Sequence, residues 1–133
     1  MIFLDTSAIY ALADKRDANH KEAKRLYDAA LRSGRAIVTH NYVIVETAAL
    51  LARRLGLSFA LTFLKEAADL DVQWISTELH TQAVDELANR NKPDLSFVDA
   101  VSFLVMERER IAEYLGFDEH FTSAGFRRID TSG

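Results

Sequence analysis

The stretch Ile2-Phe3-Leu4-Asp5-Thr6-Ser7 decides the fold, because a short apolar run ends abruptly in three polar residues. A strand that is apolar at consecutive positions is buried on both faces, which is typical of a parallel sheet covered by helices. We therefore predict a buried strand at Ile2–Leu4, with Asp5 at its carboxyl end. Ligands of open α/β sheets bind beyond the carboxyl ends of the strands, so Asp5 is the first candidate site residue.

Along the rest of the chain, apolar runs of strand length alternate with segments of helical periodicity. This alternation predicts an α/β fold with a mostly parallel central sheet and helices on both faces. The further predicted strands are Ala36–Val38 (ending at Thr39), Val72–Ile75, Glu113–Gly116 and Phe126–Ile129. The predicted helices are Ala23–Leu31, Asn41–Leu55, Ser58–Ala68, Thr77–Arg90 and Phe97–Arg110, the last of them capped by Ser96.

Length and composition predict a single globular domain over residues 1–133, with 49% hydrophobic and 27% charged residues. No run of about 18 apolar residues is present, and no basic region precedes the apolar start, so we expect neither a membrane span nor a signal peptide. The chain has no Cys, which excludes thiol catalysis, disulfides and Cys-based zinc sites. These features fit a cytoplasmic protein.

The net charge of −4 is unevenly distributed. Residues 1–54 hold nine Lys/Arg and six Asp/Glu, whereas residues 55–133 hold seven and fourteen. Nucleic-acid-binding domains are commonly strongly basic, so any nucleic-acid chemistry here needs local positive charge, a metal ion, or both. Basic residues on the first long helix could form a solvated face or a phosphate track: Lys21, Lys24, Arg25, Arg32 and Arg35. The pair Arg53-Arg54 could likewise lie on a solvated face or contact phosphates.

Four carboxylates stand in apolar or strand-end surroundings. Asp5 and Asp118 each follow a short apolar segment, Glu46 has mainly apolar helical neighbours, and Asp99 lies in a helix that is apolar nearly all round. A carboxylate in such surroundings is costly unless it is paired or bound to a metal. Each also has a structural explanation. Asp5 could cap a helix, Glu46 could lie on a solvated face, Asp99 could form a capping box with Ser96, and Asp118 could start a helical turn.

Taken together, the four carboxylates can converge at one end of a parallel sheet. Carboxylates held close together repel each other and raise one another's pKa, and a divalent cation relieves that repulsion. Oxygen-rich sites favour hard ions such as Mg²⁺ and Mn²⁺. A metal held there could lower the pKa of a bound water and offset the repulsion between an acidic site and a phosphate backbone.

Four segments carry a resemblance to a known family. They are Phe3-Leu4-Asp5-Thr6-Ser7-Ala8, Glu46-Thr47-Ala48, Asp94-Leu95-Ser96-Phe97-Val98-Asp99-Ala100-Val101-Ser102-Phe103 and Gly116-Phe117-Asp118-Glu119-His120-Phe121. In this order, and across nearly the whole chain, the sequence resembles the PIN domain family and within it the VapC-type toxin ribonucleases. The resemblance implies a three-layer α/β/α sandwich, endoribonuclease activity, and Mg²⁺ or Mn²⁺ as cofactor. It also implies a homodimer and a small antitoxin protein that blocks the site.

The motif match assigns four acidic site residues: Asp5, Glu46, Asp99 and Asp118. Asp5 and Asp99 would be the principal metal ligands, with Glu46 a ligand directly or through water. Asp118 would hold a second metal or a water network. Hydrogen bonds from Thr6 or Ser7, and from Ser96, would orient these carboxylates.

Several alternatives remain. A signalling receiver is disfavoured because only Asp5 follows the first strand, and a haloacid-dehalogenase-type phosphatase because Ser7 stands where that family has Asp. A non-toxin PIN nuclease and a catalytically silent binding module stay open. The histidines recur every twenty residues without an accompanying repeat, so only His120, beside Asp118, merits testing. Phe59, Phe63 and Trp74 are expected in the core or on a dimer surface, to which the Leu57–Ala68 helix would contribute.

Overall fold

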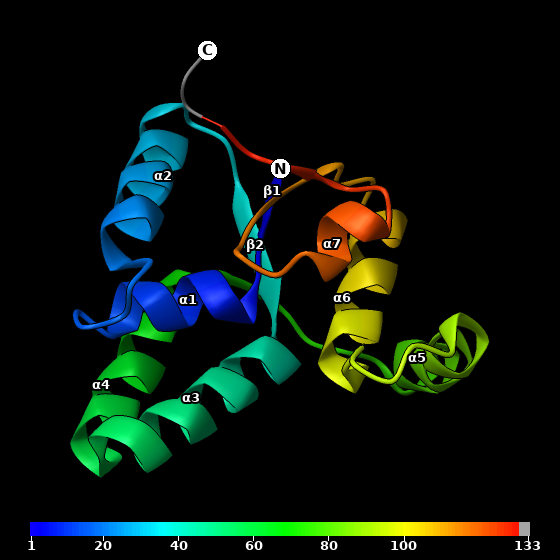
Figure 1. Ribbon diagram of the computed structural model, residues 1–133, viewed down its shortest axis with the longest axis horizontal. Helices are drawn as coiled ribbons and strands as arrows, with labels where there is room; N and C mark the ends of the chain where they lie inside the picture. Colours follow the sequence, from blue (N-terminus) through cyan, green and yellow to red (C-terminus); the bar gives the residue numbers. More distant parts are fainter. Residues whose placement is uncertain (131–133) are drawn as a thin grey trace.

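The computed structural model describes residues 1–130, in which five strands and a set of helices alternate (Figure 1). The strands are β1 (Ile2–Leu4), β2 (Ile37–His40), β3 (Asp71–Gln73), β4 (Glu113–Leu115) and β5 (Arg127–Arg128). The helices are α1 (Thr6–Ala13), α2 (His20–Arg32), α3 (Asn41–Leu55), α4 (Leu57–Glu66), the 3₁₀ turn η1 (Ala67–Asp69), α5 (Thr77–Arg90), α6 (Phe97–Arg108) and α7 (His120–Ser123). None of these helices combines the length and apolarity needed to cross a bilayer.

The five strands form one parallel sheet in the order β3-β2-β1-β4-β5. Helices α1, α2 and α4 lie on one side of this sheet and α6 and α7 on the other (Figure 1). Helices α3 and α5 lie toward the end where the strands finish. The predicted α/β/α arrangement is confirmed, and the sheet, expected to be mostly parallel, is parallel throughout.

The strands are added to the sheet on opposite sides of β1: β2 and β3 on one side, and β4 and β5 on the other. Strand β1 leads through α1 and α2 to β2 on one side, whereas its other neighbour, β4, leads through α7 to β5. Parallel crossovers are right-handed, so the helices after β1 and β4 leave toward opposite faces. This opens a crevice beyond the paired ends Leu4 and Leu115, which is the topological switch point where α/β proteins bind ligands.

Aromatic side chains fill the core on the α6–α7 side of the sheet. Phe3, Phe103, Tyr114 and Phe121 are all at most 1% exposed. The Phe121 ring stacks on Tyr114 with centroids 4.9 Å apart and meets the edge of Phe103 at 5.0 Å. These contacts tie α6 and α7 to β1 and β4, and so fix the elements that border the crevice.

Several element boundaries differ from the prediction by one to three residues. Strand β3 ends at Gln73 because the N–H of Ile75 donates to the side chain of Asn41 and not to a neighbouring strand. Helix α6 ends at Arg108, since Arg110 takes a left-handed φ of 56° and the N–H of Ile111 turns back to the carbonyl of Met106. These terminations depend on tertiary contacts and on a local backbone reversal.

A buried histidine joins the sheet to α6. His40 is 0% exposed, and its Nδ1 accepts the N–H of Val43, which leaves Nε2 to donate to Ser102 Oγ at 2.8 Å. Ser102 in turn donates to the carbonyl of Val98. Burial lowers the pKa of His40 to about 3, so the imidazole is neutral in the folded protein.

We expect His40 to make stability depend on pH. Because its folded-state pKa lies below the ordinary 6.5, its contribution is complete above that pH and is lost as pH falls toward 3, by at most about 1.4 kcal/mol per pH unit. His40→Gln keeps a neutral donor near Ser102 and should be less stable than the parent at pH 7.5. Urea denaturation should show this difference shrinking at pH 5. A difference that stays constant with pH would contradict the assignment.

Candidate active site

A cavity of about 410 Å³ lies at the switch point and is lined by the four acids and the three orienting residues predicted from the sequence, but not by His120. Its lining residues are Asp5, Thr6, Ser7, Tyr10, Asp17, Asn19, Glu46, Leu50, Arg54, Asp94, Ser96, Asp99 and Asp118. The four carboxylates come from four different elements, so only the folded chain brings them together. Their expected convergence is observed, while their individual roles stay predictions.

Asp5 is the most buried of the four carboxylates, at 3% exposure. It caps α1, with Oδ1 accepting the N–H of Thr6 at 2.7 Å, and Oδ2 accepts the Ser7 hydroxyl at 2.7 Å. The Ser7 hydroxyl also accepts the N–H of Phe117 at 2.8 Å, so it ties Asp5 to the segment after β4. Ser7 thus orients Asp5 through its side chain, whereas Thr6 does so through its backbone.

Burial raises the pKa of Asp5 to about 7, and the nearby charges of Asp99 and Asp118 add to the effect against the opposing Ser7 hydrogen bond. The backbone of Gly116 also lies close to the Asp5 carboxylate. A Cβ at Gly116 would lie 2.9 Å from Asp5 Oδ2 and 3.3 Å from Ser7 Oγ, so only glycine fits there without displacing the carboxylate. Among residues 1–130, the hydrogen bonds from Ser7 and Thr6 therefore do not offset the effect of burial on the Asp5 carboxylate.

Asp99 lies at the third position of α6 and forms the expected capping box. Its N–H donates to Ser96 Oγ at 3.0 Å, and its Oδ2 accepts the Ser96 N–H at 3.3 Å. Burial, followed by the charge of Asp118, raises the pKa of Asp99. The structural and the functional interpretations of Asp99 are compatible, because the capping bonds hold its carboxylate at the cavity wall.

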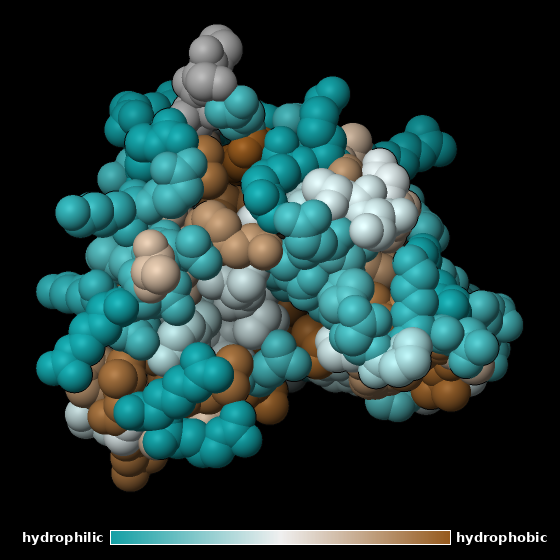
Figure 2. All heavy atoms as spheres, viewed as in Figure 1, coloured by the Kyte–Doolittle hydropathy of each residue, from teal (hydrophilic) through white to brown (hydrophobic). Residues whose placement is uncertain are grey.

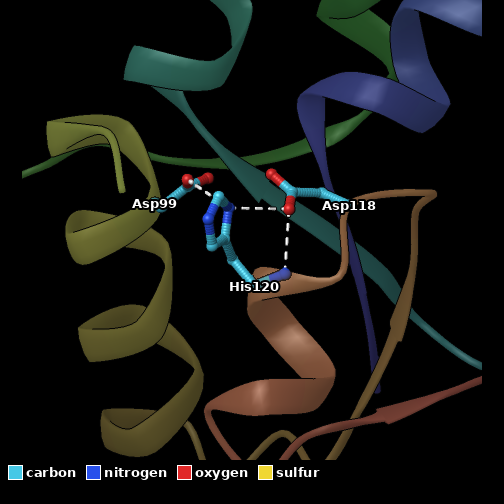
Figure 3. A group of neighbouring side chains, drawn as sticks. All are labelled: Asp99, Asp118 and His120. Carbon is cyan, nitrogen blue, oxygen red and sulfur yellow. Dashed lines mark hydrogen bonds and ion pairs between the residues drawn. The ribbon is translucent and has the colours of Figure 1, made fainter. Parts of the chain in front are cut away.

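Asp118 and His120 complete this wall (Figure 3). Asp118 Oδ1 accepts the N–H of His120 at 2.8 Å, which starts α7 as anticipated. Figure 3 shows Asp99, Asp118 and His120 pointing toward one another, with His120 Nδ1 lying 2.7 Å from Asp118 Oδ1 and 3.6 Å from Asp99 Oδ2. Their ligand atoms all lie within 4.8 Å of one another, a spacing that could hold a metal ion.

His120 also contacts Asp94, whose Oδ2 lies 3.1 Å from Nε2. Burial lowers the pKa of the His120 imidazole, but Asp94 and Asp118 outweigh that effect and raise it above its ordinary value. His120 was the one histidine singled out from the sequence, and it is the histidine that reaches the acids. Asp94 lies within a segment that carried the family resemblance but was not itself proposed as a site residue.

Glu46 faces the cavity from α3 and is half-buried. Within residues 1–130 its carboxylate has no hydrogen bond or ion pair, unlike those of the other three acids. Thr6 Oγ1 is likewise buried at the cavity with no hydrogen-bond partner among the described residues. An oxygen-rich pocket with open acceptors and an orphaned hydroxyl fits a hydrated hard cation such as Mg²⁺ or Mn²⁺.

Two lining residues, Tyr10 and Arg54, were not identified individually from the sequence. Arg54 was grouped with Arg53, although only Arg54 lines the cavity. Glu46, Leu50 and Arg54 follow one another at four-residue spacing, which places them on the same face of a helix. This spacing could have identified Arg54 as a residue on the same side as Glu46. Tyr10 had no such signal, because its position depends on how α1 packs against α3.

The fold and cavity define an α/β protein with an acidic, metal-competent site at its switch point. Residues 2–127 match the model of the PIN domain, and the chain belongs to this family. It is 37% identical over 131 residues to the 23S rRNA-specific endonuclease VapC20 from two strains of Mycobacterium tuberculosis, covering 97% of this chain and 98% of the relative.

A crystal structure of Mycobacterium tuberculosis VapC20, described as a sarcin–ricin loop cleaving toxin, superposes on this chain with a TM-score of 0.84. That match has 35% sequence identity and covers 95% of this chain and 96% of the solved one. The predicted membership in the PIN family and likeness to VapC toxins are therefore confirmed. The comparisons also support the broader prediction of an endonuclease acting on RNA.

We expect the metal-free protein to be stabilised by Asp5→Asn. With a folded-state pKa of about 7, Asp5 favours folding fully below pH 3.8, and this contribution is lost as pH rises through 7. The neutral amide avoids that loss, so Asp5→Asn in EDTA should be about 1–3 kcal/mol more stable than the parent at pH 8 and similar at pH 4. Thermal melting measures both values. Exposed Asp85→Asn is the control, and equal shifts in the two variants would contradict the prediction.

Proposed function

We propose that the chain is a Mg²⁺- or Mn²⁺-dependent endoribonuclease and the toxin of a toxin–antitoxin module. The observation that carries this proposal is the convergence of Asp5, Glu46, Asp99 and Asp118 on one cavity in a member of the PIN family. Family membership supports nuclease activity. The acidic cavity supports the use of a divalent metal ion, which the name of the family does not specify.

In this proposal each carboxylate has a defined task. Asp5 and Asp99 are the principal metal ligands, held in place by Ser7 and Ser96. Glu46 binds directly or through a water molecule, and Asp118 holds a second ion or orders water beside His120. A bound divalent ion would supply a water of lowered pKa and offset charge developing on the phosphate.

Ribosomal RNA is the proposed substrate class. The relatives are named as specific for 23S rRNA, and the solved one as cleaving the sarcin–ricin loop. With 37% identity over 97% of the chain, we propose a structured rRNA hairpin of that kind as the first substrate to test. The proposed partner is an antitoxin protein that blocks the site, and the proposed location is the cytoplasm.

The test is cleavage of a sarcin–ricin hairpin RNA by purified protein with Mg²⁺, Mn²⁺ or EDTA. We expect metal-dependent cleavage, and Asp99→Asn should lower its rate at least about 100-fold, because even residues that only support metal ligands contribute about 10–100-fold. The amide retains an oxygen to accept the Ser96 N–H, so the fold should persist. Glu107→Gln, an exposed acid on the same helix, is the matched control.

The outcomes separate the alternatives. Metal-dependent cleavage of other RNAs but not of this hairpin would favour a non-toxin PIN nuclease or a different target. A folded protein that binds metal but cleaves no RNA would favour the silent binding module. Cleavage retained in EDTA, or in Asp99→Asn, would contradict the proposed site.

We also propose a homodimer formed through the α3–α4 surface. Exposed apolar side chains gather there and include Val45, Leu57, Leu61, Leu64 and Trp74, the last 81% exposed. Figure 2 shows apolar residues at the lower left, over α4 and its turn from α3. An apolar groove of about 480 Å³ runs beside them between α3, η1 and β3. Contiguous exposed apolar surface of this kind is typical of a protein interface.

We expect light scattering to give twice the mass of the chain, and Leu64→Glu to weaken the dimer at least about tenfold by burying a charge at the interface. Phe63, packed in the core at 7% exposure, should not be substituted for this purpose. Val84→Glu is the control, since Val84 is an apolar residue 51% exposed on α5. A monomeric parent protein, or equal weakening by both variants, would contradict this surface.

A further inference from the structure

One row of α3 carries opposite charges at its two ends. Glu46, Leu50 and Arg54 follow one another at four-residue spacing, and all three line the cavity. Eight residues of helix separate Glu46 from Arg54, which corresponds to about 12 Å along the helix axis. The attachment point of Arg54 on α3 therefore lies about two helical turns beyond that of Glu46, while its side chain lines the same cavity.

Arg54 packs against Tyr10, to which its side chain also hydrogen-bonds, and its charge interacts with that of Asp14 without an ion-pair contact. Its Cζ lies 5.0 Å from the centroid of the Tyr10 ring, within the range of a cation–π contact. Tyr10 is 6% exposed, and its hydroxyl donates to Asp14 Oδ2 at 2.8 Å. Asp14 Oδ1 accepts the N–H of Arg16, so both oxygens of this acid have other donors.

Arg54 is the one Lys or Arg among the residues that line the cavity, and it forms no ion pair within residues 1–130. The basic residues of α2, the other candidate phosphate track, differ in this respect. Arg25 pairs with Glu22, Lys24 with Asp28, and Arg35, just beyond the helix, with Glu113. Three of these five cations are thus engaged in ion pairs away from the cavity, whereas Arg54 lines it.

We infer that Arg54 binds a phosphate of the RNA that flanks the scissile one, with Tyr10 as its positioning residue. This inference rests on the proposed ribonuclease function. A guanidinium presents a planar fork of donors that matches phosphate geometry, and stacking on an aromatic face fixes its orientation before the RNA arrives. Because its attachment point on α3 lies about two helical turns from that of Glu46, we assign Arg54 to a neighbouring nucleotide and not to the reacting phosphate.

A purely structural role for Arg54 has to be separated from this one. Arg53 and Arg54 both lie in the last turn of α3, where a positive charge stabilises the helix dipole. Arg53 is also exposed but does not line the cavity. Arg53→Ala therefore removes the same charge from the same helix turn and is the matched control for Arg54→Ala.

The experiment compares cleavage of the hairpin RNA by the parent protein, Arg54→Ala, Arg53→Ala and Arg54→Lys in Mg²⁺. A flanking contact made equally in the ground and transition states changes KM and not kcat. We expect Arg54→Ala to raise KM about 3–20-fold with kcat within about twofold, and Arg53→Ala to leave both nearly unchanged. Arg54→Lys should fall between the parent and Arg54→Ala, because it keeps the charge but loses the planar fork.

A second measurement does not depend on turnover. In an Asp99→Asn background, fluorescence anisotropy gives the dissociation constant of the same RNA at several salt concentrations. Removing one phosphate contact should reduce the salt slope by about 0.7–1 for Arg54→Ala and leave it unchanged for Arg53→Ala.

Each failure has its own signature. A parent protein that does not cleave RNA refutes the proposed function itself. Normal cleavage by the parent with equal effects of Arg53→Ala and Arg54→Ala overturns the inference alone. A fall in kcat at unchanged KM for Arg54→Ala also overturns it, because Arg54 would then act on the reacting phosphate.

Discussion

The buried carboxylate of Asp5 is the constraint around which the site is built. It ends a strand that is apolar on both faces, so the fold that buries Phe3 and Leu4 also removes Asp5 from water. Thr6, Ser7 and the bare backbone of Gly116 close around it. Burial raises the pKa of Asp5 to about 7, so its charged form is unfavourable in the metal-free protein. A cation bound there, as proposed, would relieve this cost.

The same carboxylates organise the surrounding backbone. Asp5 caps α1 and Asp99 closes the capping box of α6, so each accepts N–H groups at a helix start, where the positive end of the dipole offsets negative charge. Asp118 accepts the N–H that begins α7. The structural roles of these three residues are therefore compatible with the functional roles proposed for them. Glu46, in the middle of α3, has no such bonds within the described part of the chain and is the acid whose position depends most on tertiary packing.

This division explains what the sequence could predict. Strand ends in a parallel sheet meet at one edge, so Asp5 and Asp118 could be placed together from local patterns alone, and Asp99 followed from its cap. Glu46 was singled out by its apolar helical neighbours, and the family resemblance assigned it to the acidic site, because no local rule determines the direction of α3. The end of β3 depended on a hydrogen bond from Ile75 to Asn41, and the place of Tyr10 beside Arg54 on the packing of α1 against α3. Contacts between segments far apart in the chain produce no periodic pattern in the sequence, so they could not be predicted from it.

The overall charge distribution, finally, does not identify which cation could bind a phosphate. The amino-terminal half is basic, yet three of the five cations on and just after α2 are paired with acids of the same surface or of β4. What distinguishes Arg54 is its place on the wall of the cavity and its support by a buried ring. In an acidic protein, a single oriented guanidinium beside a metal-competent pocket can guide a phosphate backbone without a broad basic surface, because the bound cation offsets the remaining negative charge.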